Sequence, residues 1–335
     1  MKQLALLAAA LIAMFLNDAR AGTFDTAALQ KKSNSLVQAF NGRVGFCARL
    51  STQQVCVRGR EAFPLQNVMK LLVATAVMDA ADQGRMRLDD PVTLHVSDLS
   101  MNVQPIAALI RETGSYQTTI DDLLFRTVVD SDSAATDFLI ARLGGVGAIQ
   151  NRLERLGVKG IRIDRDERHL QTQTAGLDWR PEYVDLDVLK QALQARSDGQ
   201  KRAAFMAYLA DPRDRGSPEA MTVFLQRLAS GKLVSKASAA HLMTILSQTR
   251  TFPTRLKAGL LPGWSVAHKT GTGGTLDGMT SAANDVGVLT APDGSRIAVA
   301  VFVSRTTHPD VEQDALMASL ARVVCESYRP DASAH

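Results

Sequence analysis

Apolar and polar residues alternate along the chain with two periodicities, one typical of helices and one typical of strands. Near the start, 26–40 is predicted to be a helix, and the runs 43–50 and 54–58 alternate as two paired strands do. The segment 68–81 is almost entirely apolar, which predicts a buried helix, and Gly84 supplies a stop signal after it.

The middle of the chain has a helical pattern, whereas strand patterns return only near its C-terminal end. The first helical stretch is 119–156, with a break at Gly144-Gly145. Further helices are predicted at 184–193, 202–209, 218–228 and 236–248. The late strands are predicted at 265–269, 283–289 and 296–303, and a last helix at 311–328.

This order of elements predicts an α/β fold of the α+β type, with one sheet built from both ends of the chain. We expect residues 22–62 and 258–330 to form that α/β part. Residues 63–257 are predicted to form an all-helical domain inserted into it.

Residues 1–21 have the features of an export signal. Lys2 precedes an apolar run over 4–16, and residues 19–21 (Ala-Arg-Ala) have the small-x-small form of a cleavage site. Because the apolar run is too short to span a bilayer comfortably, a cleaved leader is favoured over a membrane anchor. We therefore expect a secreted, periplasmic protein that is not attached to a membrane after cleavage.

The composition is that of a globular protein, with 46% hydrophobic and 21% charged residues among 335 positions. The net charge is +4, but the basic residues are scattered among acidic ones, which argues against nucleic-acid binding. The six histidines lack ligand-like spacing, so we expect neither a metal nor another cofactor.

The three cysteines are Cys47, Cys56 and Cys325. An oxidising compartment permits a disulfide, and a hairpin of the first two strands could bring Cys47 and Cys56 opposite one another. Because buried unpaired cysteines are common, a bridge and two free thiols both remain open. Cys325 lies in an apolar helical stretch and is predicted to be a buried free thiol.

Four short segments carry the candidate chemistry. They are Asn67-Val68-Met69-Lys70, Ser131-Asp132-Ser133, Glu167-Arg168-His169-Leu170-Gln171 and Lys269-Thr270-Gly271-Thr272. In this order and at these separations they resemble the Ser-x-x-Lys, Ser-Asp-Asn, Glu-x-x-Leu-Asn and Lys-Thr-Gly motifs of the class A serine β-lactamases. The resemblance covers nearly the whole chain after the leader. It implies that family's antiparallel sheet flanked by helices, with a helical domain inserted.

The resemblance implies catalytic roles for three residues. Lys70, three residues after position 67 on one helix face, would take part in proton transfer. Ser131 would pass a proton to the departing nitrogen, and Glu167 would act as the general base that positions the hydrolytic water.

The same resemblance implies a substrate-binding set. Its members are Ser133, Gln171, Arg255, Lys269, Thr270, Gly271 and Thr272. Lys269, Thr270 and Arg255 would bind the substrate carboxylate, and the strand backbone near Thr272 would supply an oxyanion donor. Ser133 and Gln171 each replace a family asparagine, one that contacts the substrate's acylamino group and one that orients the water.

Asn67 is the main departure from the family pattern, because it stands where the nucleophilic serine is expected. An amide has no ionisable proton near neutral pH and cannot plausibly form the acyl-enzyme. Aligning the motif one or more positions away does not supply a nucleophilic serine, since no serine occurs between Phe63 and Lys70.

An insertion relative to the family pattern is assigned to about 178–214. It holds two helix-like pieces and the aromatic residues Trp179, Tyr183, Phe205 and Tyr208. It is either a decorated surface loop or a lid or protein-partner surface beside the pocket.

Three functions compete. The first is a non-acylating relative that binds a β-lactam, a peptidoglycan-like ligand or a protein partner. The second is an active β-lactamase in which Glu167 directs water at the amide or Ser131 replaces the missing nucleophile. The third is a cell-wall peptidase or esterase, against which Glu167 argues, since it marks lactamases that deacylate.

Overall fold

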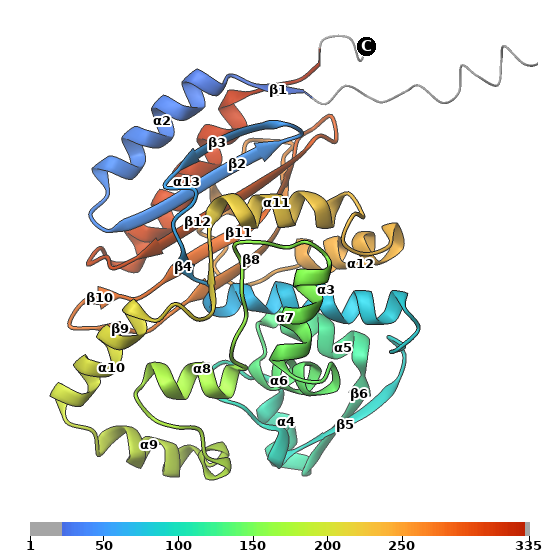
Figure 1. Cartoon of the computed structure of the whole chain (residues 1–335), viewed down its shortest axis with the longest axis vertical. Coiled ribbons are helices and arrows are strands. Elements are labelled where there is room, and N and C mark those ends of the chain that lie inside the picture. Colours follow the sequence, from blue (N-terminus) through green and yellow to red (C-terminus); the bar gives the residue numbers. More distant parts are fainter. Residues whose placement is uncertain (1–21, 332–335) are drawn as a thin grey trace, which may run out of the picture.

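A five-stranded antiparallel sheet forms the centre of the α/β part in the computed structural model, which describes residues 22–331 (Figure 1). Its strand order is β3-β2-β12-β11-β8, so strands from both chain ends lie side by side. The strands are β2 (Arg43–Leu50), β3 (Gln53–Val57), β8 (Ser265–Thr272), β11 (Ala283–Thr290) and β12 (Arg296–Ser304). This arrangement confirms the predicted fold class. The expected leader at 1–21 lies outside the described residues.

Both faces of the sheet are buried under helices. On β12, Ala298, Ala300 and Phe302 belong to one apolar cluster, and the alternate residues Val299 and Val301 belong to the other. This period of two is the strand alternation itself. The helices against one face are α2 (Thr26–Ala39) and α13 (Asp310–Ser327), and α11 (Pro218–Ala229) packs on the other. α11 therefore lies on the sheet, although the predicted boundary groups it with the helical part.

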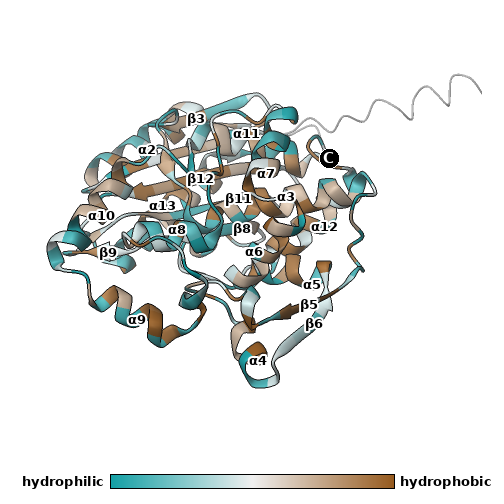
Figure 2. Cartoon of the chain, turned by 60° about the horizontal axis from the view of Figure 1, so that its bottom comes forward, coloured by the Kyte–Doolittle hydropathy of each residue, from teal (hydrophilic) through white to brown (hydrophobic). Residues whose placement is uncertain are grey.

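The helical part surrounds α3 (Met69–Asp82), whose residues are buried from Met69 to Ala80. Figure 2 shows the hydrophobic character of this helix. Its neighbours are α6 (Ser133–Arg142), α7 (Val146–Arg155) and α12 (Lys236–Ser247), and α5 (Ile120–Phe125) packs on α6. Also in this part are α4 (Ile106–Thr113) and α8 (Glu167–Thr174). No helix among residues 22–331 is long and apolar enough to cross a membrane.

The helical part also contains strands that the sequence analysis missed. β5 (Pro91–His95) and β6 (Ser115–Thr119) pair antiparallel, whereas strands were expected only near the two chain ends. β6 carries mostly polar, half-buried residues, so it has no apolar alternation to reveal it. The expectation that 119–156 begins as a helix differs by one residue, because the Thr119 side chain caps α5.

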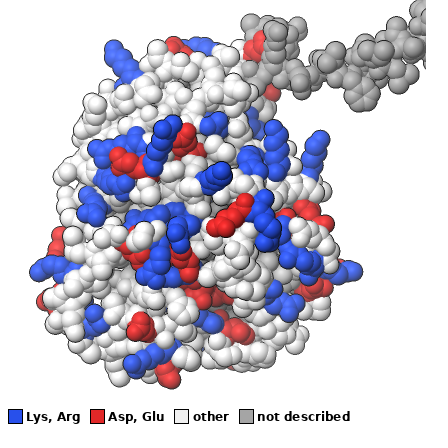
Figure 3. Space-filling view, in the orientation of Figure 1, with Lys and Arg blue, Asp and Glu red and all other residues white. Residues whose placement is uncertain are grey.

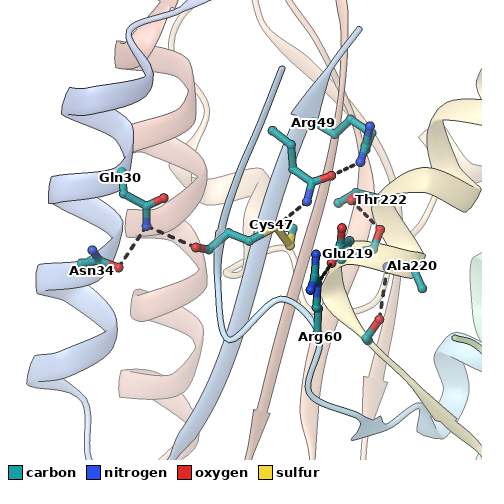
Figure 4. Close-up of a disulfide and its surroundings, with 11 residues drawn as sticks. Gln30, Asn34, Cys47, Arg49, Arg60, Glu219, Ala220 and Thr222 are labelled. Atoms are coloured by element: carbon teal, nitrogen blue, oxygen red, sulfur yellow. Dashed lines mark hydrogen bonds and ion pairs between the residues drawn. A yellow bond between two sulfur atoms is a disulfide. The ribbon is translucent and has the colours of Figure 1, made fainter. Parts of the chain in front are cut away.

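Cys47 and Cys56 face one another across β2 and β3 and form a disulfide (Figure 4). The sequence left this pairing open, and the hairpin register resolves it. Cys325 is the buried free cysteine that was expected, and burial raises the pKa of its thiol to about 11.

The predicted insertion at 178–214 contains α9 (Leu186–Gln194) and α10 (Asp198–Ala210), the two helix-like pieces expected there. Figure 1 shows both helices beside α8 at the edge of the molecule. Basic and acidic side chains are interspersed over the face in Figure 3.

Candidate functional site

Asn67 lies in a single helical turn, Gln66–Val68, that leads directly into α3. Gln66 has a left-handed φ of 49°, which is uncommon for a residue with a side chain and reverses the chain just before position 67. The Asn67 side chain is partly exposed and has no hydrogen bond to any residue within 22–331. It is therefore free to meet a ligand.

The backbone around Asn67 is pressed against β8 and β11. A Cβ atom at Gly271 would lie 2.7 Å from the Leu65 carbonyl oxygen and 3.1 Å from the Asn67 nitrogen. Only glycine permits this approach. From the next strand, the Asn284 Nδ2 donates to the Pro64 and Leu65 carbonyl oxygens at 2.8 and 3.0 Å. The turn that carries Asn67 is thus held in place from both strands.

Lys70 lies one helical turn after Asn67 and is fully buried among polar atoms. Its Nζ donates to the Ser131 carbonyl oxygen at 2.6 Å and to the Ser133 Oγ at 3.2 Å. The Ser131 Oγ is 3.4 Å from the same nitrogen. Ser131 follows the short helical segment Arg126–Asp130 and has a left-handed φ of 59°, which lets its main chain and its side chain both contact Lys70.

Glu167 is the first residue of α8 and is also fully buried. Its Oε2 accepts hydrogen bonds from the Ser133 Oγ at 3.3 Å and the Gln171 Nε2 at 3.2 Å. Its Oε1 lies 3.6 Å from the Lys70 Nζ and has no hydrogen-bond partner among the described residues. A buried carboxylate oxygen without a donor is a ready acceptor for a water or a ligand proton.

Asp137, on α6, holds the start of α8 and was not identified from the sequence. Its Oδ1 accepts from the Glu167 backbone nitrogen at 2.8 Å, and its Oδ2 accepts from the Arg168 nitrogen at 3.1 Å. Burial, and then the negative charges of Asp166 and Glu167, raise the pKa of Asp137 to about 7. Asp137 is a positioning residue for Glu167.

Lys269, on β8, is fully buried on the other side of Ser131. Its Nζ donates to the Ser131 Oγ and to the Thr270 carbonyl oxygen, both at 3.0 Å. Burial, and then the charge of Lys70, lower the pKa of Lys269 to about 7. A large share of Lys269 is therefore neutral at neutral pH, when its Nζ can accept a proton from Ser131.

Arg255 is only 1% exposed, and its guanidinium is engaged by the protein itself. Its Nε donates to the Asp314 Oδ1 at 2.7 Å, and its Nη2 donates to the Thr272 Oγ1 at 3.0 Å. The structure thus places the Arg255 guanidinium against the Thr272 side chain at the end of β8. Direct carboxylate binding by Arg255 stays a prediction. Thr270 pairs with the Thr251 hydroxyl at 2.6 Å.

The insertion reaches the site through Tyr208 on α10. The Gln66 Nε2 donates to the Tyr208 hydroxyl, and the Gln66 Oε1 accepts from the Gln171 Nε2 at 3.5 Å. Burial raises the pKa of Tyr208 to about 12, so the hydroxyl stays protonated. The sequence analysis noted Tyr208 as an aromatic residue of the insertion. It did not predict the contact with Gln66, because no local sequence pattern connects residues 142 positions apart.

The four motif segments therefore meet around one point, between Lys70, Ser131, Glu167 and Lys269. Two lysines and one glutamate share this buried cluster, with hydroxyl groups between them. No group of three or more His, Cys, Asp or Glu residues within 22–331 could hold a metal ion. Proton transfer among these side chains is the chemistry that the arrangement allows.

Comparisons with known proteins agree with this arrangement. Residues 28–328 match the model of the beta-lactamase enzyme family. Beta-lactamase VEB-1 of Pseudomonas aeruginosa is 27% identical over 306 residues, which cover 90% of either chain. The extended-spectrum beta-lactamase PER-1 of the same organism is 29% identical, and the match covers 78% of this chain and 74% of PER-1. The crystal structure of a beta-lactamase from Chitinophaga pinensis, 28% identical, superposes with a TM-score of 0.73 over 89% of this chain and 98% of its own.

Proposed function

We propose that this chain, which belongs to the beta-lactamase enzyme family, binds a β-lactam or a cell-wall-peptide-type ligand in its pocket. It does so without forming an acyl-enzyme at position 67. The observation that carries the proposal is Asn67, partly exposed at the start of α3, one turn before the buried Lys70. An amide nitrogen has a delocalised lone pair, so the side chain can hydrogen-bond a carbonyl group but cannot attack it.

The charges around Asn67 support binding of an anionic ligand. Lys70 and Lys269 both direct their Nζ atoms at Ser131, and the Glu167 Oε1 lies 3.6 Å from the Lys70 Nζ. A ligand carboxylate near Lys269 would restore the charged form of that lysine, because a nearby negative charge raises a lysine pKa. Binding should therefore take up protons above neutral pH.

Calorimetric titration with benzylpenicillin tests the binding. We expect reversible binding that weakens when the carboxylate is blocked as a methyl ester and when Lys269→Met removes its cationic partner. Lys159→Met, at an exposed lysine, is the matched control and should leave the affinity unchanged. Equal affinity for the acid and the ester would contradict the assigned orientation.

Intact-mass spectrometry tests the absence of acylation at position 67. After incubation with a fluorescent penicillin, the peptide that contains Asn67 should carry no added mass. An adduct on that residue would refute the proposal.

A second candidate is an active β-lactamase that uses Ser131, and the 3.0 Å contact between the Lys269 Nζ and the Ser131 Oγ favours it. Neutral Lys269 would take the hydroxyl proton as the Ser131 oxygen bonds to the lactam carbonyl carbon. The carbon–nitrogen bond then breaks, and Lys269 returns the proton to the nitrogen. Glu167 would activate the water that hydrolyses the ester.

Hydrolysis of a chromogenic cephalosporin tests this second candidate. It requires turnover that is lost in Ser131→Ala, together with an adduct on the peptide that contains Ser131. If the parent chain is no faster than Glu167→Ala, the candidate is eliminated.

Export to the periplasm is part of the proposal, and the Cys47–Cys56 disulfide supports it, because such bonds persist in oxidising compartments. Cell fractionation with a tagged chain should find the protein outside the cytoplasm and shortened at its N-terminus. A full-length cytoplasmic protein would contradict it.

A further inference from the structure

A cavity of about 670 Å³ lies between α10 and the segment around α8, and Asn67 is not among the residues that line it. Three arginines and one aspartate are the charged residues among those that line it: Arg165, Arg196, Arg213 and Asp211. The α10 side is formed largely by alanines, which leave room for a ligand. Ten of its thirteen lining residues lie within 178–214, and one of these, Tyr208, also contacts Gln66 of the site described above.

Arg165 is only 5% exposed, yet one of its nitrogens has no partner. Its Nε donates to the Asp214 Oδ2 at 2.6 Å, and its Nη1 donates to the Gln173 Oε1 at 3.2 Å and lies 3.1 Å from the Asp211 Oδ2. Its buried Nη2 has no hydrogen bond among the described residues. A buried guanidinium nitrogen without an acceptor is unfavourable, and an oxyanion in the cavity would satisfy it.

Arg196 provides a second, independent group of the same kind. Its Nε is buried without a hydrogen bond, and within residues 22–331 the side chain forms no ion pair. Its guanidinium lies against Gly176, where a Cβ atom would be 2.7 Å from the Arg196 Nη2. Gly176 also has a φ of 75°, a backbone conformation that favours glycine at this position. Within residues 22–331, no carboxylate pairs with Arg196 at the cavity.

Asp211, the acidic residue in the cavity, pairs with Arg165 and Arg213 but forms no ion pair with Arg196 within residues 22–331. Burial alone would raise the pKa of Asp211, but hydrogen bonds from Arg213 and the charge of Arg165 outweigh it and lower the pKa to about 2. Both Asp211 oxygens accept hydrogen bonds from Arg213. The carboxylate is therefore occupied, while Arg165 Nη2 and Arg196 Nε have no hydrogen-bond partner among the described residues.

We propose that this cavity binds a phosphate or carboxylate group, held by Arg165 and Arg196 through charge-assisted hydrogen bonds. The planar guanidinium fork fits both kinds of oxyanion. Tyr208 lines the same cavity and contacts Gln66, so the cavity and the turn that carries Asn67 share one side chain.

Titration of the full chain with inorganic phosphate and, separately, with acetate tests the proposal and shows which oxyanion is preferred. Thermal unfolding should shift upward saturably with one or both anions, beyond the shift in chloride at equal ionic strength. Arg196→Gln is the informative variant, because Arg196 forms no ion pair within residues 22–331 that the substitution would remove. It should weaken the apparent affinity by roughly tenfold or more, the effect of losing charge-assisted hydrogen bonds. Arg196→Lys should have an intermediate affinity.

Arg180→Gln is the matched control, since it removes one exposed arginine from the same insertion. It should leave the affinity unchanged. Equal anion affinity in Arg196→Gln and the parent chain would refute the assignment, as would stabilisation that chloride reproduces in full. Neither result depends on whether Asn67 binds a lactam, so failure here and failure of the proposed function are distinguishable.

Discussion

Replacing Lys269 with methionine should change how the stability of the protein depends on pH. The pKa of Lys269 is about 7 in the folded protein, compared with its ordinary value of 10.5. Between these two values the unfolded chain binds a proton that the folded chain lacks. The free energy of unfolding therefore rises with pH across this window, and the charged lysine destabilises the fold most below pH 7.

The size of the effect follows from the pKa difference. The slope approaches about 1.4 kcal/mol per pH unit, which amounts to about 2 kcal/mol between pH 7 and pH 9. Lys269→Met has no such proton to release, so its stability should lack this part of the rise. Urea unfolding at several pH values measures both curves.

The slope is the informative quantity, because the variant also loses the hydrogen bonds from the Lys269 Nζ to Ser131 and Thr270. That loss shifts the whole curve without changing its slope. Lys159→Met, at an exposed lysine, should retain the slope of the parent chain. If Lys269→Met and the parent chain have parallel curves from pH 7 to pH 9, the lysine is not held in the environment described above.

Three further predictions concern the frame of the site. Gly271→Ala places a Cβ atom 2.7 Å from the Leu65 carbonyl oxygen, so unfolding free energy should fall by about 1–3 kcal/mol; unchanged urea unfolding would contradict this contact. Replacing Cys47 and Cys56 by alanine should cost about 2–3 kcal/mol, and a reducing agent should then have no further effect on melting. The pKa of Asp137 is raised to about 7, so its protonation stabilises the folded protein fully below about pH 4, and this stabilisation is lost as pH rises through 7. Asp137→Asn should flatten the fall in unfolding free energy over this range, and an equally steep fall in the variant would refute the prediction.

The strands and helices with a continuous apolar pattern were predictable from the sequence. The expected strand at 43–50 matches β2 residue for residue, and the helix expected at 68–81 differs from α3 by one residue at each end. In both segments an almost continuous apolar run coincides with almost continuous burial, so the signal lies within the segment itself. The convergence of the four motif segments was expected from the family resemblance, and not from any such pattern.

The parts that could not be predicted depend on contacts between distant segments. β6 is polar and is a strand only because β5 lies beside it. Asp137 acts on Glu167 across 30 positions, and Tyr208 contacts Gln66 across 142. No periodicity connects residues so far apart. Arg255 is a related case, because its burial and its pairing with Asp314 follow from the packing of α13 against the sheet.

The most direct test of the central claim is to restore a hydroxyl with Asn67→Ser and to measure hydrolysis of a chromogenic cephalosporin together with the intact mass. The account predicts that this variant gains an adduct on the peptide containing position 67 and hydrolyses the cephalosporin measurably faster than the parent chain. Lys70, Ser131, Glu167 and Lys269 are already gathered around that position. A parent chain that is itself acylated at Asn67, or an Asn67→Ser variant that forms no adduct, would contradict the claim that the missing nucleophile is what prevents acylation at position 67.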